Sequence, residues 1–169
     1  MLDRLGINPT QLTGLLSFVA AATACMVAAP RSTWPNSRVW QILGFINGIF
    51  FVEIIFGLRH RIHDYLVALL RAEGEYGQRR GMQELVLIGL GTIALICVML
   101  LLFSRSLAGN VRIAGALTIA LLTLFAIETV SLHSLDALLY GSIGPVALIG
   151  WLWAIATVGI CWTALTAKG

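Results

Sequence analysis

The sequence predicts an all-α integral membrane protein, built as one domain from a bundle of five transmembrane helices, with four as the alternative count. Of the 169 residues, 59% are hydrophobic and 11% are charged. A soluble domain is about 25% charged, so this chain has too little charge to cover a surface in water. Five apolar segments also approach the roughly 20 residues that a helix needs to cross a bilayer. These observations argue against a soluble enzyme, a secreted disulfide scaffold, a disordered chain and a nucleic-acid-binding protein.

We expect the five helices at about residues 12–29, 39–58, 85–103, 113–130 and 145–165. Pro30 closes the first segment, the third is the most uniformly apolar, and Pro145 suits the first turn of the fifth helix. The first segment is short enough to be a signal peptide, but Asp3 and Arg4 leave no positively charged region before it. We therefore expect a retained helix.

One long polar segment, residues 59–83, separates the second helix from the third. Its first part has apolar residues at helical spacing from 58 to 70, which predicts one apolar helix face. This pattern indicates a short amphipathic extension, either continuous with the second helix or lying at the lipid surface.

The charge distribution bears on localisation, which we expect to be a bacterial inner membrane or a plasma membrane. With the N-terminus in the cytoplasm, six arginines lie on the cytoplasmic side and five cationic residues on the other side. Five of those six arginines fall within residues 59–80. This bias favours a cytoplasmic N-terminus by the positive-inside rule. The three cysteines, Cys25, Cys97 and Cys161, lie inside apolar segments without CxxC spacing, so we interpret them as small core residues.

Two carboxylates, Glu53 and Glu128, lie inside apolar segments. A charge in hydrocarbon costs several kcal/mol, so such groups usually face protein or a water-filled cavity. They predict either a proton or ion site, or a carboxylate that bonds a neighbouring helix. Both interpretations stay open at this stage.

Polar residues also gather beyond the second and fourth helices. At about 100° per residue, Glu53, His60 and Asp64 share one helix face, with His63 beside it. His133 and Asp136 form a similar face if the fourth helix continues. Because both helices cross the membrane in the same direction, their C-terminal ends emerge on the same side. We therefore predict one cluster at one membrane face, made of His60, His63, Asp64, His133 and Asp136.

This cluster has more than one chemical interpretation. Imidazole and carboxylate groups are ligands for zinc, iron or manganese, and His60 with His133 is a possible axial pair for haem. The spacing matches no named signature, and no HExxH or ExxH motif is present. A structural network, in which Arg59 and Arg61 pair with Asp64, Asp136 or lipid phosphate, is the alternative. The sequence does not decide whether the protein is an enzyme.

These features predict a non-catalytic accessory or assembly subunit of a larger membrane complex. The chain is short, little of it lies outside the membrane, and its polar residues gather in one patch that another protein can contact. The expected partners are the lipid bilayer and other membrane subunits, or a second copy of the chain. The alternatives are a membrane metalloenzyme or haem protein, and a proton or ion transport component that uses Glu53 and Glu128.

Overall fold

The computed structural model describes residues 8–59, 61–62, 64–65, 68, 79–130 and 133–167, with only the backbone described at 79, 80, 82, 133, 134 and 136. Among these described residues, five helices are long and apolar enough to cross a membrane. They are α1 (Pro9–Ala28), α2 (Asn36–Phe56), α4 (Arg79–Phe103), α5 (Gly109–Val130) and α7 (Leu148–Leu165). The short elements are η2 (Ala29–Arg31), α6 (His133–Leu139), β1 (Ser142–Ile143) and β2 (Val146–Ala147). The prediction of an all-α multi-span membrane protein is confirmed.

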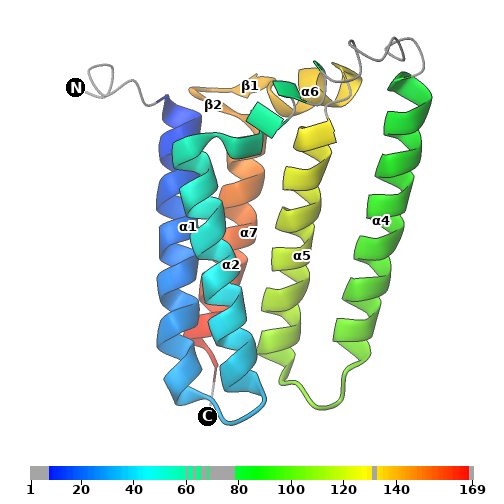
Figure 1. The fold of residues 1–169 in the computed structure, drawn as a ribbon. Coiled ribbons are helices and arrows are strands. Elements are labelled where there is room, and N and C mark those ends of the chain that lie inside the picture. The colour runs from blue at the N-terminus through cyan, green and yellow to red at the C-terminus, as the bar shows by residue number, and fades with distance from the viewer. Residues whose placement is uncertain are drawn as a thin grey trace.

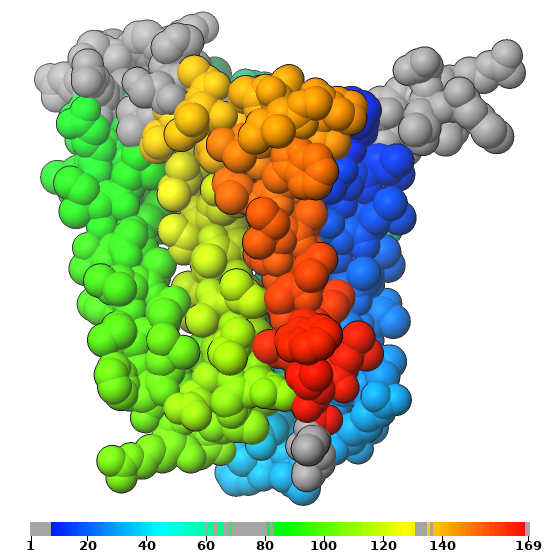
Figure 2. Space-filling view, turned by 180° about the vertical axis from the view of Figure 1, so that it is seen from behind, coloured from blue at the N-terminus to red at the C-terminus, as the bar shows by residue number. Residues whose placement is uncertain are grey.

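The helices divide into a packed group and an outlying helix. α1 packs against α2 and α7, and α5 packs against α7 and α2. α4 packs against α5 at the edge of the bundle (Figure 1). Figure 2 shows α4 along that edge, with α5 between it and α7. We call α1, α2, α5 and α7 the four-helix core.

Local sequence signals explain where α1 and α2 begin and end. The Asn8 side chain accepts a hydrogen bond from the Gln11 backbone N–H, and the Gln11 side chain accepts one from the Asn8 N–H. This capping box starts α1 at Pro9, three residues before the expected boundary. Gly57 ends α2 in the left-handed conformation, with φ 58°, which a residue with a Cβ rarely adopts.

Gly57 also decides the course of the segment after α2. The described residues from Leu58 to Ala68 are helical, but the left-handed turn separates them from α2. Figure 1 shows this segment turning across the end of the bundle. The helical extension is therefore present, and it is not a straight continuation of α2.

The last transmembrane helix begins later than expected. We predicted Pro145 inside its first turn, but α7 starts at Leu148. Gly144 and Pro145 form the turn of a small hairpin in which Ile143 pairs with Val146. The positive φ of Gly144, 70°, favours this reversal over a helical turn. The prediction of a helical Pro145 was wrong because Gly144 and Pro145 form a tight turn.

Aromatic rings form the centre of the four-helix core near one end. The Phe50 and Phe125 rings stack with centroids 4.6 Å apart, and Phe125 also stacks on Trp153 at 5.7 Å. Phe18 contacts all three rings. Cys25 is buried as expected, whereas Cys97 is exposed on α4. The interpretation of Cys97 as a core residue was wrong because α4 lies outside the core.

Candidate functional site

The ends of α2 and α5 meet through one buried arginine. Arg59 follows the turn at Gly57, and Glu128 lies in the last turn of α5. The Arg59 Nη1 donates a hydrogen bond of 2.6 Å to the Glu128 Oε2. The Glu128 side chain is 1% exposed and the Arg59 side chain 10%. The two helix ends therefore lie side by side, as the direction of the helices predicts.

Glu53 contacts the same arginine from α2. The Arg59 backbone N–H donates to the Glu53 Oε1 at 3.2 Å, and the Arg59 Nε lies 3.6 Å from the same oxygen. The Gly57 N–H donates to the Glu53 carbonyl at 2.7 Å, which holds the turn in place. The left-handed turn thus brings the backbone and side chain of Arg59 back onto Glu53.

Tyr140 and two aromatic rings complete the surroundings of the arginine. The Tyr140 hydroxyl donates to the Glu128 Oε1 at 2.8 Å. The Arg59 guanidinium carbon lies 4.8 Å from the Phe125 ring centroid and 5.3 Å from that of Trp153. Such cation–π contacts are stronger where water is excluded. We call Glu53, Arg59, Glu128 and Tyr140 the charged cluster.

The two carboxylates of the charged cluster favour a cation at its centre. α2 and α5 end here with partial negative charge, while α1 and α7 begin at the same end with partial positive charge. One guanidinium faces two carboxylates, so the three side chains carry a net charge of −1 if both acids are ionised. Removing one partner of a buried ion pair costs about 3–5 kcal/mol, because it leaves an uncompensated charge. The cluster can thus hold the ends of α2 and α5 together.

A cavity of about 150 Å³ lies beside the charged cluster. Asn8, Gln11, Glu53, Tyr140 and Trp153 are among the residues that line it. The Glu53 Oε2 and the Trp153 Nε1 are buried and have no hydrogen-bond partner among the described residues. The cavity has room for several water molecules, and its lining contains polar groups with which water can form hydrogen bonds.

The predicted His/Asp cluster lies largely outside what the structure describes. His60 and His63 are outside the described residues, and the side chains of His133 and Asp136 in α6 are not described. Asp64 is exposed. Among the described residues, no group of three or more His, Cys, Asp and Glu side chains is placed to hold a metal ion. The metal and haem interpretation of these five residues stays a prediction.

The structure brings together the two predicted carboxylates and corrects the pairing of Arg59. The structural network that we considered gave Asp64, Asp136 or lipid phosphate as the partners of Arg59, but Arg59 pairs with Glu53 and Glu128. The reason is the reversal at Gly57, which turns Arg59 toward the bundle. Sequence reasoning also missed the contact between Tyr140 and Glu128. The available signal was Gly57 itself, because a glycine near the end of a helix predicts a left-handed turn.

We compared the chain with models of protein families, with curated proteins and with solved structures, and no match was found.

Proposed function

We propose that this protein is a non-catalytic subunit of a larger membrane complex and that it contacts its partner through α4. The observation that carries the proposal is the exposure of α4. No residue in the most apolar window of its span, Gln83–Phe103, is buried, whereas 33–39% of the corresponding windows in the other four spans are buried.

The face between α4 and α5 has the shape and chemistry that a transmembrane helix of a partner requires. An apolar groove of about 390 Å³ runs between the two helices. Ala94 of α4 and Ala120 of α5 are among its lining residues, with Leu95, Val98 and Ile119 beside them. Small residues let helix backbones approach closely, and packing of this kind drives helix association in lipid.

The charged cluster fits a structural role in such a subunit. Its guanidinium is paired with two carboxylates and lies over the rings of Phe125 and Trp153. The stacked rings of Phe50 and Phe125 lie in the bundle interior next to it. A buried ion network with an apolar layer beside it holds helix ends in register and gives the partner a rigid surface.

Photo-crosslinking in the native membrane tests the proposal. A photoreactive phenylalanine analogue replaces Leu95, which lines the groove and is 63% exposed. The matched control replaces Ile155 on α7, which is 68% exposed. We expect an adduct with a different membrane protein from position 95 and none from position 155. Adducts with lipid alone, equal adducts at both positions, or an adduct only with a second copy would overturn the proposal.

A second candidate, a proton or ion transport component, is favoured by the Glu53 Oε2, which has no hydrogen-bond partner among the described residues. Glu53 lines a cavity beside the charged cluster. Flux of protons or cations into proteoliposomes tests this candidate. Glu53→Gln should abolish the flux, while Glu84→Gln, at an exposed carboxylate on α4, should leave it unchanged. No flux in the unaltered protein would exclude the candidate.

For orientation we propose a cytoplasmic N-terminus in a bacterial inner or plasma membrane. In this orientation six arginines lie on the cytoplasmic side of the membrane and five cationic residues on the other side, which supports the proposal. A cysteine at exposed Ser106, in a variant without the three natural cysteines, tests this orientation. A membrane-impermeant maleimide should label it from outside intact cells. Labelling only after lysis would reverse the orientation.

A further inference from the structure

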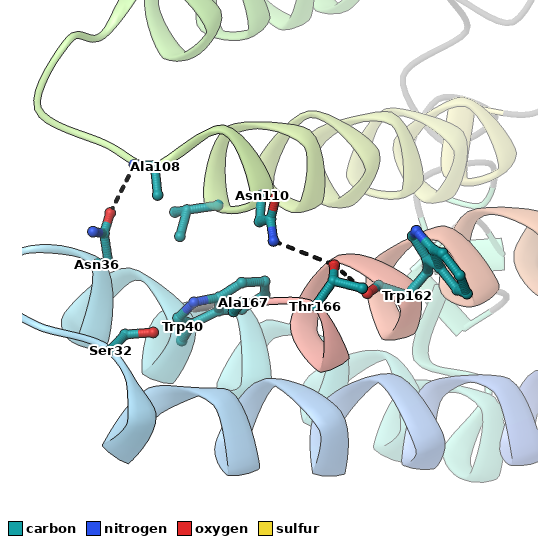
Figure 3. A pocket seen from close by; sticks show the side chains of 9 residues that line it. Ser32, Asn36, Trp40, Ala108, Asn110, Trp162, Thr166 and Ala167 are labelled. Carbon is teal, nitrogen blue, oxygen red and sulfur yellow. Dashed lines mark hydrogen bonds between the residues drawn. The ribbon is translucent and has the colours of Figure 1, made fainter. Parts of the chain in front are cut away.

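A second cavity, of about 440 Å³, lies at the end of the bundle opposite to the charged cluster. Three separate stretches of the chain contribute to its wall, and Figure 3 shows their side chains. The polar and aromatic lining residues are Ser32, Asn36, Trp40, Asn110, Trp162 and Thr166. We call this cavity the polar pocket.

Hydrogen bonds fix the wall of the polar pocket. The Ala108 backbone N–H donates to the Asn36 Oδ1 at 3.0 Å, which joins the start of α5 to that of α2. The Asn110 Nδ2 donates to the Thr166 Oγ1 at 3.2 Å, and the Thr166 hydroxyl donates to the Trp162 carbonyl at 2.8 Å. Dashed lines mark these three hydrogen bonds in Figure 3. The pocket is thus built from tertiary contacts of three helices.

One donor in the wall is buried without an acceptor. Trp40 is 0% exposed, and its Nε1 has no hydrogen-bond partner among the described residues. A buried N–H without a partner costs about 1–3 kcal/mol, so an acceptor in the pocket that reaches this N–H would offset that cost. The free N–H groups of the Asn36 and Asn110 side-chain amides supply further donors.

The charged side chains around the polar pocket have one sign. α2 and α5 begin here with partial positive charge, while α1 and α7 end at the same end with partial negative charge. Arg31, Arg38, Arg105 and Arg112 lie in or beside the two connections at this end, residues 29–38 and 104–112, which contain no carboxylate. The Arg112 Nη1 donates to the Leu102 carbonyl, while its Nε has no hydrogen-bond partner among the described residues. The donors and the charges together favour an anion.

We propose that the polar pocket binds the phosphate-bearing headgroup of a membrane phospholipid. Helix N-termini and amide donors suit the phosphate oxygens, and the arginines attract the charge. The pocket opens at the end of the transmembrane helices, beside Trp162, whose ring is 70% exposed. This position lets the acyl chains stay in the bilayer while the headgroup occupies the pocket. Inorganic phosphate shares the binding chemistry but lacks that anchor.

Native mass spectrometry of the purified full chain in mild detergent tests the proposal. The probes are phosphatidylglycerol, diacylglycerol with the same acyl chains, and inorganic phosphate. We expect one phosphatidylglycerol bound per chain and no retained diacylglycerol, which lacks the phosphate. Equal retention of the two lipids would overturn the proposal. If inorganic phosphate binds as tightly as the lipid, the proposal that the ligand is a lipid is overturned.

Asn110→Asp places a negative charge in the pocket with little change in size, although it also removes the N–H that donates to the Thr166 hydroxyl. A carboxylate in the first turn of α5 favours the helix, so the variant should fold, but it repels a phosphate. Like-charge repulsion costs more than 1.4 kcal/mol, so we expect phosphatidylglycerol binding at least about tenfold weaker. Unchanged binding in a variant with an unchanged thermal transition would contradict the proposal.

A matched tryptophan pair separates the pocket from general adsorption to the membrane surface. Trp40→Phe removes the buried N–H and keeps a ring, so it should weaken phosphatidylglycerol binding severalfold. Trp34→Phe changes a residue at the same end of the bundle that is 77% exposed and does not line the pocket. It should leave binding unchanged. Equal weakening by both variants would show adsorption without a site and would overturn the proposal.

Discussion

The most apolar helix of this protein is the least buried one. The window of α4 has a mean hydropathy of 3.0 and no buried residue, while those of the four-helix core have values of 1.8–2.0 and are about one-third buried. In a soluble protein the opposite relation is expected, because water drives apolar residues inward. In a bilayer, lipid accepts leucine and isoleucine as well as protein does. High hydropathy therefore identifies the helix that lies outside the core.

Small and polar residues identify the packed faces of the core instead. A Cβ on Gly44 of α2 would lie 2.9 Å from the Met26 sulfur on α1, so the two helices approach closely there. Asn47, Thr118 and Thr157 are buried as well. On α4, by contrast, a Cβ on Gly89 or Gly91 would meet nothing within 4 Å. A glycine in a helix therefore indicates close helix packing only where a second helix lies against it.

The largest expected effect is at the charged cluster of the core. Arg59→Leu removes the guanidinium that Glu53 and Glu128 share, and we expect a loss of about 3–5 kcal/mol in the free energy of unfolding. Denaturant unfolding in detergent micelles or bicelles measures this loss. Arg61→Leu, at an exposed arginine two residues away, should change stability by less than about 0.5 kcal/mol.

A double variant sharpens this first prediction. Arg59→Leu combined with Glu128→Leu removes both charges of the pair. It should be more stable than Arg59→Leu alone, because the more deeply buried of the two carboxylates, Glu128, is no longer left next to an apolar side chain. If the two single losses simply add, Arg59 and Glu128 are not coupled, and the cluster does not hold the helix ends together.

The second effect compares glycines of the two regions, beginning with the core. A Cβ on Gly14 of α1 would lie 3.0 Å from the Trp153 ring and 3.3 Å from Ile54. Trp153 is stacked on Phe125 and cannot move freely. We expect Gly14→Ala to lower stability by about 1–3 kcal/mol through overpacking, measured in the same unfolding assay. A stabilised variant would mean that the core around Trp153 is loosely packed.

The smallest effect is on α4 and has the opposite sign. Gly89→Ala adds a methyl group where nothing lies within 4 Å, in the interior of a helix. Alanine has a higher helix propensity than glycine. We therefore expect the free energy of unfolding of the isolated protein to rise by up to about 1 kcal/mol. A clear loss of stability in detergent would show that α4 packs more closely than the structure indicates, and the contrast between α4 and the core would fail.

The sequence predicted a large part of the fold and a smaller part of the candidate site. Hydropathy located all five spans because transfer into lipid depends on each segment alone. The number of spans also placed Glu53 and Glu128 at the same end of the bundle. The predicted partner of Arg59 was wrong because the pairing depends on the backbone reversal at Gly57. The predicted start of α7 was wrong because Pro145 suits a tight turn as well as a helix.

By itself, the amino-acid sequence determined the environment of this protein, the number of its membrane-spanning segments and the end at which its acidic residues emerge. All of these follow from local composition and from the alternating direction of successive helices. Only the tertiary structure decided that α4 stays outside the core, that Arg59 joins two glutamates, and that Trp40 lies in the wall of a polar pocket. These depend on which helix faces meet, and such contacts join residues far apart in the chain.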